Sequence, residues 1–259
     1  MSGPLVRLGY LFPDSLAIAT REVIRGIRER SRLLGSLARP FIWLFLLGTG
    51  LRAAVGNPGG IDYAHYIFPG MMVMNVLFAS IMAGTSVIWD REFGFLKEIL
   101  VAPVSRTAIA LGKTLGGAVL AVIQGALVMI FLPFLGFTGA AWRLAAVLPC
   151  LALVALAITS LGMLIAVRMR SFEGFGVMNN FVVMPMFFLS GALYRTDQAP
   201  AWLQVIIRIN PVNYGVDLVR SVFLGTPSHY GAGMDAAFLG IFTVILLGMT
   251  VFFFRRENR

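Results

Sequence analysis

The residues that could carry chemistry in this chain of 259 residues are few and far apart. Gly112-Lys113-Thr114 resembles the end of a phosphate-binding loop, but such a loop needs a glycine at position 107, where the chain has Thr107. His65 and His229 have no Cys, Glu or second His at metal-ligand spacing. We therefore expect no nucleotide site, no metal site and no catalytic residue on this chain.

Charged residues are scarce as well. They make up 13% of the chain, against about 25% in an ordinary soluble domain, and 58% of the residues are hydrophobic. Five windows of about 20 residues, the length that a helix needs to cross a bilayer, contain no Asp, Glu, Lys or Arg: 63–89, 114–142, 144–167, 174–194 and 236–254. Carriers driven by protons or sodium place ionisable groups at such depths. The pattern predicts a helical multi-pass membrane protein whose energy comes from another chain.

A sixth span over 33–55 is less obvious, because Arg39 and Pro40 interrupt its apolar run. Six spans with both termini in the cytoplasm place 16 Lys and Arg inside and five outside, whereas omitting this span gives twelve against nine. The positive-inside rule favours six. We therefore predict an all-α integral membrane protein with a cytoplasmic N-terminus (1–32) and one transmembrane domain (33–259). Its spans are predicted at about 33–55, 67–89, 114–138, 144–167, 174–193 and 236–254.

Three segments outside the spans carry amphipathic patterns. Residues 15–30 place Leu16, Val23, Ile24 and Ile27 on one helical stripe, which fits either a helix on the inner membrane surface or one docked on the protein's own cytoplasmic side. The cytoplasmic coupling loop, 90–113, begins with a predicted short helix. The outer segment, 194–235, contains two short runs that cannot span and are predicted to sit in the outer leaflet or to cap the bundle. These two runs are 202–209 and 216–224.

Uncharged polar residues in the spans have two interpretations. They can hydrogen-bond between neighbouring helices, or they can line a substrate path. The residues concerned are Asn75, Gln124, Asn179, Asn180 and Pro185, the last in the middle of the predicted fifth span. Small residues four positions apart would also permit close helix contact, as Ser80 with Gly84 and Gly112 with Gly116 do.

Two stretches resemble a known family. The segment 90–106, Asp-Arg-Glu-Phe-Gly-Phe-Leu-Lys-Glu-Ile-Leu-Val-Ala-Pro-Val-Ser-Arg, followed by Leu-Gly-Lys at 111–113, looks like the cytoplasmic signature of type-2 ABC export permeases. That group includes daunorubicin-resistance, nodulation-factor and polysaccharide export subunits. The second stretch runs from 188–194, Phe-Leu-Ser-Gly-Ala-Leu-Tyr, to 209–214, Ile-Asn-Pro-Val-Asn-Tyr. The chain departs from the family's common residues at Phe95, Lys97 and Ala102.

The resemblance implies a bacterial inner-membrane complex of two permease copies above two cytoplasmic ABC ATPase subunits, which would bind the ATP and Mg²⁺. A short helix in the loop would contact the ATPase, although the loop could instead be a plain solvated connection. The implied ATPase-binding residues are Arg91, Glu92, Phe93, Gly94, Phe95, Leu96, Lys97, Glu98 and Pro103. The implied outer re-entrant segment includes Tyr194, Asn210 and Pro211.

Several functions remain open at this stage. The first expectation is an exporter of a hydrophobic drug or lipid-like substrate, and the alternative within the same family is a lipid-linked saccharide. An ATP-independent carrier or scramblase and a membrane scaffold are the competing classes. The net charge of +9 follows the positive-inside distribution. The expected partners are therefore the ATPase, a second permease copy and membrane lipids, with no nucleic acid.

Overall fold

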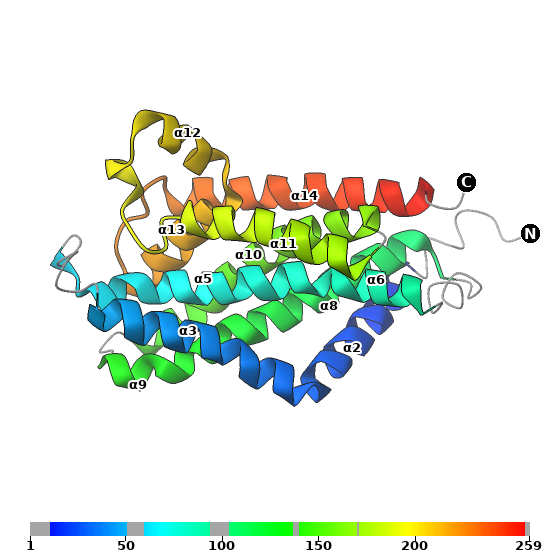
Figure 1. The fold of residues 1–259 in the computed structure, drawn as a ribbon, viewed down its shortest axis with the longest axis horizontal. Coiled ribbons are helices and arrows are strands. Elements are labelled where there is room, and N and C mark those ends of the chain that lie inside the picture. Colours follow the sequence, from blue (N-terminus) through cyan, green and yellow to red (C-terminus); the bar gives the residue numbers. More distant parts are fainter. Residues whose placement is uncertain (1–10, 51–59, 94–103, 137–139, 170, 257–259) are drawn as a thin grey trace, which may run out of the picture.

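The computed structural model describes residues 11–50, 60–93, 104–136, 140–169 and 171–256, and every regular element in them is helical (Figure 1). The helix α2 begins and α14 ends at one end of the bundle, here called the terminal end, and α12 lies at the other, the distal end (Figure 1). The helices are α2 (Leu11–Arg28), α3 (Arg30–Gly50), α5 (Tyr63–Ala83), α6 (Thr85–Glu92), α8 (Arg106–Leu127), α9 (Leu132–Leu135), α10 (Ala141–Arg168), α11 (Phe172–Phe188), α12 (Ala201–Ile209), α13 (Pro211–Leu224) and α14 (Ala232–Arg256), with 3₁₀ turns η2 (Val128–Phe131) and η3 (Thr196–Gln198).

Four helical stretches are long and apolar enough to cross a membrane, which makes the protein multi-pass. They are Tyr63–Glu92, Arg106–Leu135, Ala141–Arg168 and Ala232–Phe254. The other two predicted spans correspond to α3 and α11, which also lie roughly along the long axis (Figure 1). With 17 residues α11 is short for a span, and α3 contains Pro40 and Arg39, whose guanidinium lies 3.7 Å from the centroid of the Phe78 ring. The count of six spans stays a prediction.

Two helix ends differ from the predicted bounds, one because a polar residue caps the helix earlier and one because a turn ends it. The third span was predicted from residue 114, but α8 begins at Arg106, since Ser105 caps it by accepting a hydrogen bond from the Ala108 amide. The fifth was predicted to reach 193, but α11 ends at Phe188 before a turn in which Gly191 has a φ of +68°. The predicted end of the first span, 51–55, lies outside the described residues.

The N-terminal helix α2 packs on α8 through small residues. Its buried face is Ser15, Ala19, Glu22 and Gly26, and a Cβ added at Gly112 of α8 would lie 2.7 Å from the Ser15 carbonyl oxygen. Such contact leaves the apolar stripe unpacked, because Leu16, Ile24 and Ile27 are exposed. Helix α2 is therefore docked on the protein through its other face, and its apolar stripe is left free to contact the membrane surface.

The two short helices of the predicted outer segment behave differently. Apolar side chains of α12 are exposed, among them Trp202 and Val205. In contrast, α13 packs against α5, α10 and α14 and buries Val212, Val216 and Phe223. Helix α13 is therefore part of the core, and whether the two runs lie in the outer leaflet or cap the bundle stays a prediction.

Candidate functional site

The predicted coupling loop starts from a helix that is fixed to its neighbour. Arg91 of α6 donates hydrogen bonds to the Met169 carbonyl and, at 3.2 Å, to the Val167 carbonyl, at the end of α10. Phe93 stacks on Trp89 with ring centroids 4.6 Å apart, while Glu92 and Phe93 are exposed. The other predicted ATPase-binding residues lie outside the described residues: Gly94, Phe95, Leu96, Lys97, Glu98 and Pro103.

A buried cluster of charges joins the two ends of this loop to α2. The Lys113 side chain is fully buried, and its Nζ lies 2.6 Å from Asp90 Oδ2 and 3.2 Å from Glu22 Oε1. It also lies 3.2 Å from the Ser86 hydroxyl. Arg21 at the rim is 3.1 Å from Glu22 and 3.6 Å from Asp90. The charge cluster, Arg21, Glu22, Asp90 and Lys113, therefore ties α2, α6 and α8 together.

The electrostatic environment keeps Glu22 ionised. Burial by itself would raise the pKa of Glu22, but the combined attraction of Lys113 and Arg21 outweighs it and holds the pKa below its ordinary value. From the sequence, Asp90 and Lys113 are predicted only as the ends of a loop, without a contact between them. The opposite charges at the first and last residues of this loop were the sequence signal that could have predicted the pair.

The predicted substrate-path residues fall into two groups. Asn75 of α5 donates a 2.6 Å hydrogen bond to the Gln124 carbonyl of α8, so the interpretation as an interhelical bond holds for Asn75. Asn179, Asn180 and Pro185 lie on α11, where Asn180 and Pro185 are exposed. Pro185 is in the last turn of α11, not in the middle of a span. The structure brings Asn75 and Gln124 together and leaves the other three apart from them.

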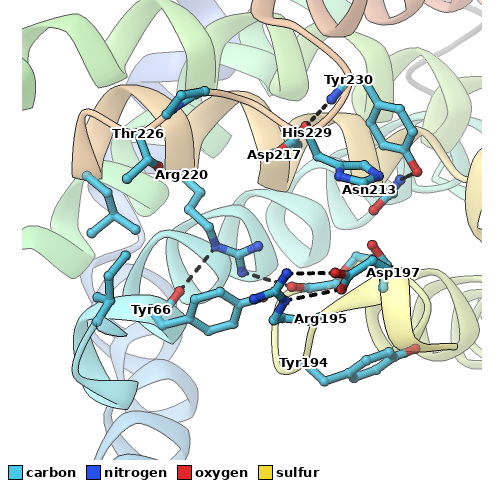
Figure 2. Close-up of a pocket in the computed structure, with 16 residues that line it drawn as sticks. Tyr66, Tyr194, Arg195, Asp197, Asn213, Asp217, Arg220, Thr226, His229 and Tyr230 are labelled. Atoms are coloured by element: carbon cyan, nitrogen blue, oxygen red, sulfur yellow. Dashed lines mark hydrogen bonds and ion pairs between the residues drawn. The ribbon is translucent and has the colours of Figure 1, made fainter. Parts of the chain in front are cut away.

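At the distal end a polar cavity of about 320 Å³ lies between α5, α13 and the segments after α11 and α13 (Figure 2). This volume is at the lower end of the roughly 300–1,000 Å³ of small-molecule sites. Its charged residues include two arginines and two aspartates, and Arg195 pairs with Asp197 at 2.7 Å. The lining includes Tyr66, Tyr194, Arg195, Asp197, Asn213, Asp217, Arg220, His229 and Tyr230.

Arg220 organises this cavity. Its guanidinium lies 4.0 Å from the Tyr66 ring centroid and donates hydrogen bonds to the Tyr66, Gly191 and Ala192 carbonyls at 3.3, 2.8 and 3.2 Å. These bonds join α13 to α5 and to the turn after α11. In the sequence, Arg220 is predicted only as one of the five outer basic residues, although its position in an apolar run indicates burial.

The predicted outer residues surround the same region. Tyr194 lines the cavity. Asn210 caps α13 by accepting a hydrogen bond from the Val212 amide and donates one to the Met186 carbonyl at 2.7 Å, and Pro211 is the first residue of α13. The Asn-Pro pair thus begins a core helix and holds it to the end of α11.

We expect Arg220→Met to lower the stability of the purified protein by about 2 kcal/mol, because three carbonyls lose their donor and water in the cavity replaces it only in part. Thermal denaturation followed by size-exclusion chromatography measures this loss. Arg195→Met removes the same charge from an exposed pair and should leave the melting temperature unchanged. Equal melting curves for the two variants would contradict the role given to Arg220.

Comparison with known proteins identifies relatives along most of the chain. The profile of the ABC-2 type transporter family matches residues 14–224. Nodulation protein J of Rhizobium leguminosarum bv. trifolii is 34% identical over 77% of this chain and 79% of its own length. Nodulation protein J of Rhizobium meliloti (strain 1021) is 33% identical over 79% of both chains. The transport permease ycf38 of Cyanophora paradoxa is 28% identical over 83% of this chain and 76% of its own.

Proposed function

This chain belongs to the ABC-2 type transporter family, and from that premise we propose that it is the membrane subunit of an exporter powered by a separate ATPase. The name of the ycf38 relative describes a transport permease, in agreement with a subunit that is not itself an enzyme. Its apolar helices make it a multi-pass membrane protein. The bacterial inner membrane, with both termini in the cytoplasm, is the proposed location.

The charge cluster is the observation that supports the proposed coupling. Asp90 and Lys113 lie at the two ends of the predicted ATPase-binding loop, and both contact Glu22 or its neighbour Arg21 on α2. A partner that pulls on the loop would therefore move α6, α8 and α2 as one unit. The movement that ATP hydrolysis causes in the ATPase, with its Mg²⁺, would be transmitted to the permease through the charge cluster.

We further propose that two permease copies and two ATPase copies form the working complex. In the single chain, one face of α11 is exposed and mostly apolar, with Val177, Phe181 and Met184 beside Asn180. A second copy facing α11 would enclose a path between the two chains that is lined by apolar side chains and an amide. Such a lining suits a lipid-like or hydrophobic substrate.

A lipid-linked saccharide is the second candidate substrate, and the distal cavity favours it. Three tyrosines, Asn213 and paired charges line this cavity. Tyrosine faces and amide or carboxylate groups can contact the apolar faces and hydroxyls of a sugar. Measuring transport in vesicles that contain either a fluorescent phospholipid or a lipid-linked oligosaccharide would show which of the two is the substrate.

The coupling proposal is tested by copurifying the tagged chain with its ATPase and measuring ATP hydrolysis. We expect Leu96→Asp, in the predicted contact helix, to reduce ATPase capture and the permease-dependent part of hydrolysis at least tenfold, because a charge enters an apolar contact. Val205→Asp makes the same change on exposed α12 and should leave capture intact. Unchanged capture with Leu96→Asp would refute the loop's role, and lipid movement by the chain alone would favour the carrier hypothesis.

A further inference from the structure

A second cavity, of about 270 Å³, opens beside the elbow where α2 meets α3. The two helices form a V whose apex points away from the bundle (Figure 1), and the chain leaves the helical path at Glu29. The opposite walls come from α5, α6 and α8. The cavity is lined by Glu22, Arg25, Gly26, Glu29, Arg32, Ala79, Met82, Ala83, Thr85, Ser86, Trp89, Lys113, Gly117, Leu120 and Gln124.

The rim at the elbow carries a positive charge that no carboxylate among the described residues neutralises. Arg25 and Arg32 share one carboxylate, Glu29, at 3.9 and 3.5 Å, and all three side chains are between 40% and 49% exposed. Pairs at such distances and exposures are weak and readily exchange partners. Toward the terminal end, the carboxylates of Glu22 and Asp90 are neutralised by Lys113 together with Arg21. One net positive charge remains at the rim, which matches the single negative charge of a phosphodiester.

Below the rim the walls become apolar. They are formed by Met82, Ala79 and Ala83 of α5 and by Leu120 of α8. Trp89 lines the cavity and is 44% exposed, and tryptophans of this kind are enriched at the headgroup level of membranes. The exposed apolar stripe of α2 indicates the same depth. The cavity therefore crosses from a charged layer to an apolar layer, as a phospholipid does.

A buried amide lies at the inner end. Gln124 is 6% exposed and lines the cavity, and its side chain makes no hydrogen bond to the described part of the chain. Gly26 of α2, next to Arg25, packs directly against Leu120, so the Arg25 part of the rim is near the level of Leu120. Gln124 follows one helical turn later, roughly 6 Å deeper. A lipid held by its phosphate at the rim would present its glycerol ester carbonyls near this depth, where they could accept a hydrogen bond from the amide.

We propose that this cavity binds the phosphodiester headgroup of a phospholipid from the leaflet at the terminal end of the bundle. Arg25 and Arg32 hold the phosphate, the walls from α5 and α8 enclose the glycerol region, and Gln124 donates to an ester carbonyl. The bound lipid would fill the space between the elbow and the joint of α6 with α8. It is a resident ligand of the fold and does not depend on the proposed export activity.

The test is native mass spectrometry and thermal denaturation of the full-length, delipidated protein in detergent. Three probes separate the possible sources of binding: dioleoylphosphatidylglycerol, dioleoylglycerol with the same chains but no phosphate, and glycerophosphoglycerol with no chains. We expect the phospholipid to bind and raise the melting temperature, and the other two to bind at least tenfold more weakly. The double variant Arg25→Gln/Arg32→Gln should reduce phospholipid affinity about tenfold or more, as expected for lost charge-assisted hydrogen bonds to phosphate.

The matched control is Arg28→Gln/Arg30→Gln, which removes the same charge from the same elbow outside the cavity lining. It should retain the phospholipid affinity, and Gln124→Leu should reduce it several-fold. Equal losses in both double variants would show only general attraction to a charged surface and would overturn the proposal. So would equal binding of dioleoylglycerol. Strong binding of glycerophosphoglycerol would make the ligand a free phosphodiester and would overturn the lipid assignment.

Discussion

Lys113→Met is expected to destabilise the protein by about 3–5 kcal/mol, which for a membrane protein of this size means poor recovery from the membrane. The substitution keeps the length of the side chain but leaves Glu22 and Asp90 as buried carboxylates without their central cation. Breaking a buried ion pair from one side has a cost of this size, because the remaining charge stays in a medium that solvates it badly. Yield and melting temperature in mild detergent measure the effect.

Neutralising Glu22 and Asp90 as well should restore much of the stability lost in Lys113→Met. In Lys113→Met/Glu22→Gln/Asp90→Asn no buried charge remains unpaired, so the triple variant should melt well above Lys113→Met alone. If the triple variant folds but its ATPase hydrolyses ATP without transport, the cluster couples the subunits as well as stabilising the fold. A Lys113→Met variant as stable as the unmodified protein would contradict the burial of Lys113.

The charge cluster also shows where prediction from the sequence reached its limit. Charge-free windows predicted the long helices because hydropathy within a segment is a local property. The bond between Asp90 and Lys113 is not local: it depends on α6 and α8 both extending beyond their apolar cores and meeting α2. A hydropathy window ends a helix at the first charges, so both residues were placed in a loop.

The outer segment shows a similar limit of prediction from local sequence. Its lengths and the Asn210-Pro211 break correctly predicted two short helices, since α12 ends at Ile209 and α13 begins at Pro211. Burial could not be predicted, since both runs are amphipathic and only the packing of α5, α10 and α14 decides which is covered. Arg220 illustrates the point, because an arginine with three carbonyl acceptors inside the fold looks in the sequence like any outer basic residue.

The helices next to the predicted ATPase-binding loop are held together by contacts of two kinds. Charges join α2, α6 and α8 at the terminal end, whereas bare backbone contact joins the end of α5 to α10. A Cβ at Gly84 would lie 2.6 Å from the Gly162 carbonyl oxygen, and one at Gly162 would lie 2.9 Å from the Ile81 Cα. The spacing of Ser80 and Gly84 predicted a close contact of this kind, and Ser80 also belongs to it, with its carbonyl oxygen 3.0 Å from that second Cβ.

Gly162→Leu should therefore be the most damaging substitution in the spans that leaves charge unchanged. The new side chain meets backbone, which cannot rotate away as a side chain can, so α5 and α10 must separate and lose packing along their length. We expect a loss of about 3 kcal/mol or more, seen as aggregation on size-exclusion chromatography. Gly240→Leu adds the same side chain to α14, where a Cβ meets nothing within 4 Å, and should give a normal profile. Normal behaviour of both variants would mean that the two helices do not touch at this crossing.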